Sequence, residues 1–147
     1  MEQPHIAARH DLTAKETEDL EDRLYDFNVG RTGYGDGAPL AFLAEVAGEL
    51  VGAAAGYTWG GICELRQVWV HEDHRGRGLG ARLIGEAVRE ARLRGCVDIF
   101  LTTYDFQAPG FYANQGFRAV AEVRDKPVGH TEFVMRLSLA GGVPLQI

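Results

Sequence analysis

The stretch from Val68 to Gly80 constrains this chain most, because an apolar run, a glycine-rich turn and a helical pattern follow one another there. The apolar run ends at Val70, glycines stand at positions 76, 78 and 80, and apolar residues recur at helical spacing from Leu79 onward. In such a turn, backbone N–H groups can converge on a ligand, and the helix N-terminus adds unpaired donors and a positive dipole end. The order predicts a strand, a phosphate-binding turn and a helix; an ordinary tight turn is the alternative.

The glycine spacing separates this turn from two common phosphate-binding motifs. The third glycine comes one residue too early for G-x-G-x-x-G, and G-x-x-x-x-G-K-[S/T] is absent. The pattern Arg75-x-x-Gly78-x-Gly80 instead resembles the acetyl-CoA signature [Q/R]-x-x-G-x-[G/A] of the GNAT superfamily of N-acetyltransferases. The segment from Ala108 to Phe117 resembles that family's A-x-x-[F/Y]-Y-x-x-x-G-F element. The resemblance covers about residues 40–137 well and the N-terminal third only in outline.

Composition limits the class of protein. The chain has 147 residues, 46% of them hydrophobic and 24% charged, which is typical of one globular domain over residues 1–147; residues 141–147 are expected to form a loose tail. No apolar run reaches membrane-spanning length and no signal peptide is evident, so we expect a cytoplasmic protein without a membrane partner. The net charge of -6 disfavours a nucleic-acid partner. Cys63 and Cys96 are expected to be buried free thiols.

The order of elements predicts an α/β protein. A strand–helix–strand unit implies that the strand entering the glycine turn pairs in parallel with the strand after the helix. The resemblance to GNAT proteins implies a mixed, mostly antiparallel central sheet, flanked by helices, whose parallel pair is splayed at the cofactor site, with a bulge in the first strand of that pair. The predicted elements are an extended segment at 5–9, a helix from the Thr13–Glu16 capping box to about Asn28, strands at 40–46, 50–59 and 62–70, a helix at 79–94, a strand at 97–102, a helix at 109–115, and strands at 117–123 and 131–139.

The resemblance implies acetyl-CoA as the acetyl donor. Its diphosphate would bind the turn, and its amide-bearing arm would pair with the strand before the turn, where the N–H of Val70 would polarise the thioester carbonyl. Asp105 stands where many members have an asparagine, and an ionised aspartate cannot donate a hydrogen bond to the arm. Gln107 is the alternative donor. The predicted cofactor residues are Val68, Trp69, Val70, Arg75, Gly76, Arg77, Gly78, Leu79, Gly80, Asp105 and Gln107.

Two residues are the catalytic candidates. Glu64 lies six residues before Val70, so regular alternation would place both on one face of the sheet, and certain family members carry a catalytic glutamate at this spacing. The alternative is a surface ion pair, for which Arg66 is the neighbour. Tyr112 matches the family tyrosine that protonates the leaving thiolate; the alternative is a core tyrosine with a satisfied hydroxyl.

The acceptor side is the least determined by the sequence. The resemblance places Tyr34 and Asp36, in the glycine-rich loop at 30–39, and His130, at the last hairpin, beside the acceptor; His130 is also a candidate base, or simply a turn histidine. His71 and His74 are spaced like metal ligands, but without a third ligand we expect no metal. The acceptor is expected to be a small-molecule or peptide amine of undetermined identity, and a homodimer stays open.

These patterns predict an N-acetyltransferase that works by direct attack in a ternary complex, because neither cysteine is placed as an acyl carrier. A non-catalytic acyl-CoA-binding or regulatory module of the same fold is the main alternative. A nucleotide-binding protein is disfavoured because no Mg²⁺-binding Ser or Thr follows the glycines.

Overall fold

The computed structural model describes residues 1–139, in which two compact units separate at Gly35: Met1–Gly35 and the part from Asp36 onward. The predicted tail at residues 141–147 lies outside the described residues. Along residues 1–139, none of the helices is both long enough and apolar enough to cross a membrane.

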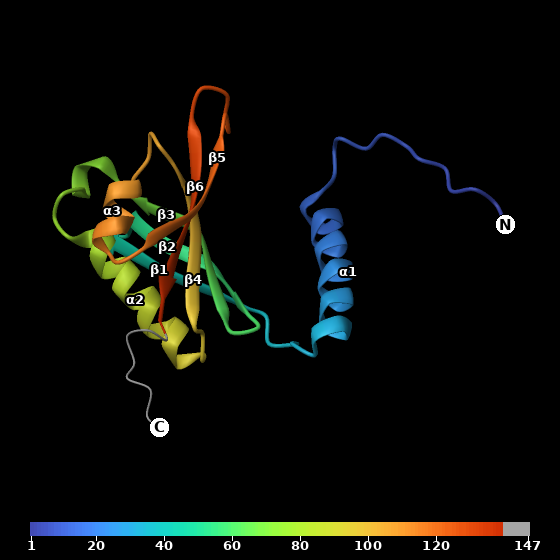
Figure 1. Cartoon of the computed structure of the whole chain (residues 1–147), viewed down its shortest axis with the longest axis horizontal. Coiled ribbons are helices and arrows are strands. Elements are labelled where there is room, and N and C mark those ends of the chain that lie inside the picture. Colours follow the sequence, from blue (N-terminus) through green and yellow to red (C-terminus); the bar gives the residue numbers. More distant parts are fainter. Residues whose placement is uncertain (140–147) are drawn as a thin grey trace. The chain divides into compact units, whose positions relative to one another are not determined.

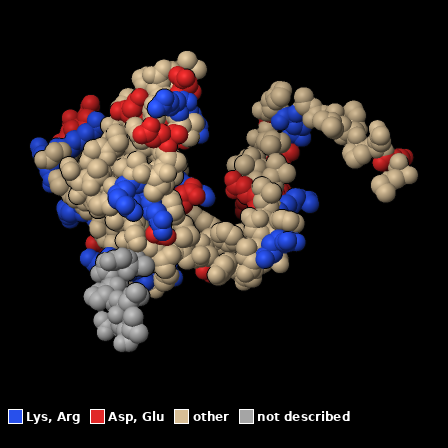
Figure 2. All heavy atoms as spheres, viewed as in Figure 1, with Lys and Arg blue, Asp and Glu red and all other residues tan. Residues whose placement is uncertain are grey.

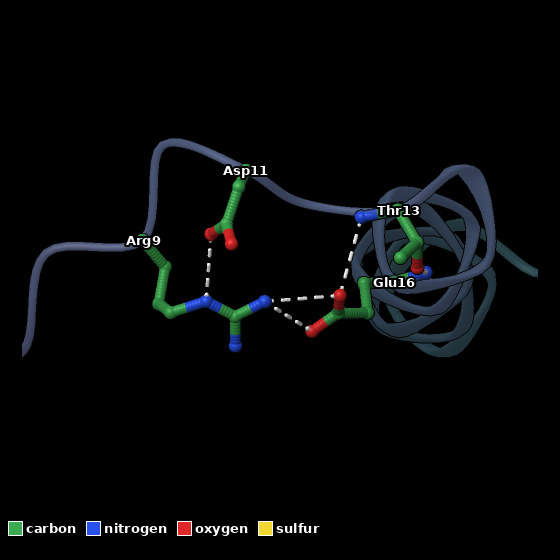
Figure 3. Close-up of polar contacts among 4 residues, drawn as sticks. All are labelled: Arg9, Asp11, Thr13 and Glu16. Atoms are coloured by element: carbon green, nitrogen blue, oxygen red, sulfur yellow. Dashed lines mark hydrogen bonds and ion pairs between the residues drawn. The ribbon is translucent and has the colours of Figure 1, made fainter.

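The first unit contains helix α1 (Ala14–Thr32). The predicted capping box is confirmed: Thr13 accepts from the Glu16 N–H at 3.1 Å, and the Glu16 carboxylate accepts from the Thr13 N–H at 3.2 Å. Figure 3 shows the Arg9 side chain reaching the same carboxylate while also binding Asp11. Two expectations are wrong. No strand forms at residues 5–9, and the helix runs four residues beyond Asn28, because Gly33 in a left-handed conformation (φ 80°) caps it there.

The second unit is built on a six-stranded sheet of order β1-β2-β3-β4-β6-β5. All neighbouring strands are antiparallel except β3 and β4, which are parallel as predicted. Figure 1 shows α2 and α3 on the same side of this sheet. The elements are β1 (Ala38–Val46), β2 (Glu49–Trp59), β3 (Ile62–Val70), the 3₁₀ turn η1 (Glu72–His74), α2 (Leu79–Leu93), β4 (Asp98–Tyr104), α3 (Pro109–Asn114), β5 (Arg118–Arg124) and β6 (Thr131–Ser138).

Helix α2 forms because its apolar residues recur on one side, and that side packs on the sheet. Leu83, Ile84, Ala87 and Ala91 are buried, and the core they join includes Cys63, Leu65 and Ile99 of β3 and β4. Fully burying a side chain such as Ile84 stabilises the fold by roughly 1.5–3 kcal/mol. The helix is thereby fixed on the sheet with its N-terminus at the end of the glycine turn.

A bulge interrupts β3. The pairing steps from Ala55↔Gln67 to Gly56↔Leu65, so Arg66 is an extra residue in β3. Gly56 makes this possible, because a Cβ there would overlap the carbonyl oxygen of Glu64. The bulge implied by the family resemblance is therefore present, and it changes which side chains of β3 share a face.

Candidate functional site

Strands β3 and β4 pair at their N-terminal ends and then separate. The pairing joins Ile62↔Asp98, Cys63↔Ile99 and Glu64↔Phe100, and goes no further. Toward their C-terminal ends the two strands no longer pair with each other; we call the opening between these unpaired ends the cleft. The glycine turn follows β3, and α3 follows β4. The predicted splay of the parallel pair is confirmed.

The main chain of β3 faces this cleft at alternate residues. The His71 N–H donates to the Val51 carbonyl of β2 at 2.8 Å, so the main-chain groups of His71 point toward β2. Neighbouring residues of a strand point their main-chain groups to opposite sides, so those of Val70 and Val68 point away from β2 and toward the cleft. Trp69 lies out of phase with them, so its main-chain groups pair with Ala53 of β2. The main-chain groups of Val68 and Val70 are thus available to a polar arm, whereas those of Trp69 pair with β2. Cofactor binding by these three residues stays a prediction.

The glycine turn holds a row of unpaired donors. Gly76 (φ 73°) and Gly78 (φ 80°) adopt left-handed conformations that favour glycine. Within residues 1–139, the main-chain N–H groups from Gly76 to Gly80 make no hydrogen bond, whereas the next donor with a partner, Arg82, binds the Gly78 carbonyl at 3.0 Å. These donors stand at the N-terminus of α2, which is the geometry of an anion site.

Basic side chains lie in and beside the turn, next to the carboxylates of Glu72 and Asp73 in η1. Figure 2 shows Lys and Arg side chains along the edge of the second unit where the turn lies. Arg75 folds back, and its Nε donates to the Val70 carbonyl at 2.9 Å. A cavity of about 450 Å³ opens beside the turn on the side of β1; His74, Arg77 and Arg82 line it together with Glu45 and Glu86. A helix N-terminus and several cations together suit a multiply charged anion.

Glu64 lies on the other face of the sheet from Val70. The prediction that the two share a face is wrong, because the extra residue Arg66 shifts the alternation by one. Leu65 before the bulge and Val68 after it both pack toward the core under α2, which turns Glu64 to the exposed face. There it accepts from the Arg66 Nε at 3.2 Å, as the ion-pair alternative predicted. Its role as a base stays a prediction.

Tyr112 is buried on α3 between Phe111 and Phe117, with ring centroids 5.3 and 5.8 Å away. Burial raises the pKa of its phenol. Within residues 1–139 the Tyr112 hydroxyl has no hydrogen-bond partner. Because every fully buried side-chain oxygen in this part of the chain does have a partner, the hydroxyl oxygen must be at least partly exposed. The ring is therefore part of the core, and the role of the hydroxyl as an acid stays a prediction.

Asp105 and Gln107 follow β4, and both are engaged with the protein. Burial raises the pKa of the Asp105 carboxyl, but hydrogen bonds from the Thr131 N–H (2.9 Å) and His130 (3.0 Å) outweigh it and lower the pKa overall. The Gln107 Oε1 accepts from the Tyr104 N–H at 2.9 Å, an arrangement that leaves its amide NH₂ as a donor. Asp105 is therefore tied to β6, and Gln107 keeps the donor capacity that the sequence suggested.

An aromatic cluster next to Asp105 was missed by the sequence reasoning. Tyr104 and Phe106 stack with ring centroids 5.2 Å apart and an interplanar angle of 5°. The His130 ring meets Phe106 edge to face at 5.0 Å. The signal was present in the sequence, because two aromatic residues alternate across the end of a strand, but only the fold brings His130 to them.

The other two acceptor candidates, Tyr34 and Asp36, lie in different units of the chain. Asp36 accepts from the Gly60 N–H at 3.0 Å, in the turn before β3, which is the end of that strand remote from the glycine turn. Asp36 is thus held at that remote end, and its contact with an acceptor stays a prediction. Tyr34 belongs to the first unit, where its N–H donates to the Thr32 hydroxyl at 3.1 Å. Its contact with an acceptor stays a prediction.

Cys63 and Cys96 are free and buried, as predicted. Burial raises the pKa of the Cys63 thiol to about 11, so it is protonated at neutral pH and is a poor nucleophile. The His71 Nδ1 accepts from the Asp73 N–H at 3.1 Å, which makes it a turn residue. In the part of the chain that the structure describes, no three His, Cys, Asp or Glu side chains form a metal-binding group.

Known proteins are similar to this chain in sequence and in fold. The profile of the acetyltransferase (GNAT) family matches residues 5–117. Blasticidin-S acetyltransferase of Streptomyces morookaense is 38% identical over 110 residues, covering 71% of this chain and 81% of that protein. The crystal structure of an acetyltransferase from Bacillus cereus superposes with a TM-score of 0.77 at 25% identity, covering 92% of this chain and 97% of that one.

A more distant structure agrees in fold. Aminoglycoside 6′-N-acetyltransferase complexed with coenzyme A has a TM-score of 0.64 at 19% identity, covering 90% of this chain and 96% of that one. The match over residues 5–117 and the 38% identical relative settle the family: this chain belongs to the acetyltransferase (GNAT) family.

Proposed function

We propose that this protein transfers an acetyl group from acetyl-CoA to a primary amine of a small molecule, by direct attack in a ternary complex. The observation that carries the proposal is the row of N–H donors from Gly76 to Gly80, which have no partner among the described residues and lie beside the cleft between β3 and β4. Structures of the same fold hold coenzyme A, which supports this choice of anion. Acetyl-CoA supplies an activated thioester.

The chain's own groups supply binding and orientation. The glycine-turn amides and the α2 N-terminus would hold the diphosphate, with Arg77 and Arg82 nearby. The cleft-facing main chain of Val68 and Val70 would pair with the amide-bearing arm, and the Val70 N–H would donate to the carbonyl oxygen as negative charge develops there. Holding both reactants in one cleft removes much of the entropic cost of the step.

Tyr112 is proposed as the acid. Its phenol is protonated at neutral pH, because burial raises a pKa whose ordinary value is already 10. Within residues 1–139 its hydroxyl has no hydrogen-bond partner, so it can donate to the leaving sulfur. The acceptor is proposed to be a small amine because the relative from Streptomyces is named for blasticidin S, and another structure of this fold for aminoglycosides.

Acetyl-CoA binding tests the donor site directly. Gly78→Glu places a carboxylate at the turn, and we expect it to abolish binding measured by titration calorimetry. Gly95→Glu is the matched control: Gly95 has φ 78° against 80° for Gly78, and a Cβ at either position meets no heavy atom within 4 Å. Intact binding in Gly78→Glu, or equal loss in Gly95→Glu, would contradict the proposed cradle.

Turnover is tested by thiol release from acetyl-CoA with blasticidin S, an aminoglycoside, spermidine and a short peptide as acceptors. We expect release with at least one small-molecule amine. Tight acetyl-CoA binding without release on any of them would instead support a non-catalytic acyl-CoA-binding module.

A further inference from the structure

His130 is held by contacts of both its main chain and its ring, although about half of its side chain is exposed. Its main-chain N–H donates to the Pro127 carbonyl at 2.9 Å, and its own carbonyl accepts from the Lys126 N–H at 3.1 Å. Its ring lies against the edge of Phe106, and its Nδ1 is 3.0 Å from Asp105 Oδ1. Both the backbone and the ring of His130 therefore have one defined position.

Asp105 determines the protonation pattern of this ring. The carboxylate stays ionised because the Thr131 N–H and His130 lower its pKa despite the cost of burial. An ionised carboxylate only accepts, so the neutral imidazole must carry its proton on Nδ1 and leave Nε2 as a lone-pair acceptor. This is the arrangement in which a carboxylate prepares a histidine to take up a proton.

The contact is not needed to hold the two loops together. The Asp105 N–H donates to the Thr131 carbonyl at 2.9 Å, and the Thr131 N–H donates to Asp105 Oδ2 at 2.9 Å. These two bonds already join the end of β4 to the start of β6. The imidazole adds to a connection that exists without it, and 48% of the His130 side chain remains exposed.

The Asp105–His130 pair lies at the end of β4 that borders the cleft. Asp105 directly follows β4, which forms one wall of the cleft, and the same loop leads into α3, where the Tyr112 N–H donates to the Ala108 carbonyl. The proposed acid and the Asp105–His130 pair therefore flank one short segment, residues 105–112. Glu64, the other candidate base, already accepts from the Arg66 side chain.

We propose that His130 is the base that deprotonates the acceptor ammonium and that Asp105 positions it; this rests on the proposed function. One N–H proton of the ammonium passes to Nε2 and then to water. The freed lone pair forms the N–C bond at the thioester carbonyl, the C–S bond breaks, and the sulfur gains a proton from Tyr112. The second N–H proton restores the Tyr112 phenol.

The charged and titratable groups around His130 fit this role. Asp105 and Tyr104 approach from the β4 side, and Asp125, Lys126 and Glu132 belong to the hairpin. Lys126 pairs with Glu132 at 3.0 Å, and the Asp125 carboxylate accepts from the Gly129 N–H at 3.2 Å. Among these groups Asp105 is the carboxylate hydrogen-bonded to the ring, so it compensates the imidazolium that forms.

His130→Asn tests the proposal, because its side-chain amide keeps a donor for Asp105 and removes Nε2. With the panel amine that is turned over fastest, we expect kcat/KM at pH 7 to fall about 100-fold or more. The deficit should shrink as the pH approaches the pKa of the amine, because more acceptor is then deprotonated in solution. Acetyl-CoA affinity and Tm should match wild type, and His10→Asn, in the first unit, should behave as wild type.

A wild-type rate and pH profile in His130→Asn would overturn the proposal. A pH-independent loss of kcat/KM accompanied by a lower Tm would also overturn it, because that is the result expected of a purely structural contact. A wild-type protein that binds acetyl-CoA but acetylates no amine would remove the proposed function itself. The tautomer is tested separately by nitrogen NMR of the imidazoles. Wild type should show the Nδ1–H form for His130 and Asp105→Ala should lose it; an Nε2–H form in wild type would overturn the positioning role.

Discussion

Replacing Gly56 by alanine should destabilise this protein more than the same change at Gly52, the other glycine of β2. The new Cβ would overlap the Glu64 carbonyl oxygen and would lie 2.9 Å from both the Glu64 carbonyl carbon and the Leu65 Cα. All three atoms are main chain, so no side chain can rotate away and β2 or β3 must move. Overpacking costs about 1–3 kcal/mol when neighbours can adjust, and here we expect at least about 3 kcal/mol.

The assay is thermal unfolding followed by circular dichroism. For a chain of this size, about 3 kcal/mol corresponds to a Tm lower by roughly 6–12 °C. Gly85→Ala is the matched control, because a Cβ at that position in α2 meets no heavy atom within 4 Å and alanine favours the helix by up to about 1 kcal/mol. The same substitution is therefore expected to lower Tm at Gly56 and to raise it at Gly85. A Gly56→Ala protein that melts within a degree or two of wild type would refute the close approach at the bulge.

Three further predictions follow from the site. Tyr112→Phe should lower kcat by about 100-fold or more while acetyl-CoA affinity stays near wild type; because burial raises the phenol pKa, the wild-type rate should show no loss from tyrosine ionisation below pH 10. Asp105 should stabilise the fold fully at a pH above its ordinary pKa of 3.8, and this contribution should vanish as the pH falls through its pKa in the folded protein, which is lower. The Tm difference between wild type and Asp105→Asn should therefore become smaller on acidification from pH 6 to pH 3. Cys63 and Cys96 should react with a thiol reagent at pH 8 only after denaturation, and rapid labelling of the native protein would contradict their burial.

The features that the sequence predicted well are those that depend on neighbours in the chain. The capping box of Thr13 and Glu16 needs only three residues, and α2 follows from one apolar stripe between two glycines. The parallel pairing of β3 with β4 follows from the helix that joins them. Each of these structures is specified within one segment, so the sequence pattern alone was sufficient.

The face of Glu64 was mispredicted because it depends on a residue in another strand. Counting six positions to Val70 assumes unbroken alternation, and the extra residue Arg66 breaks it. The bulge exists because Gly56 in β2 has no side chain to prevent the approach. A glycine inside a strand pattern is a recognised sign of a bulge or a close backbone approach, so the sequence did contain a warning.

The donor and acceptor sides of the site differ in how they can be found. The proposed donor side is made of main-chain N–H groups, so it needs only the backbone of one turn and one strand, and a short motif is enough to locate it. The proposed acceptor side is made of side chains: Asp105 and His130 are 25 residues apart and meet because β4 and β6 are neighbours. A local motif cannot encode such a pair, and it can therefore differ between proteins that bind the same donor. If His130 is the base, proteins of this family that share the glycine turn need not share their proton acceptor, and the acceptor amine would be chosen by segments far from the motif that identifies the fold.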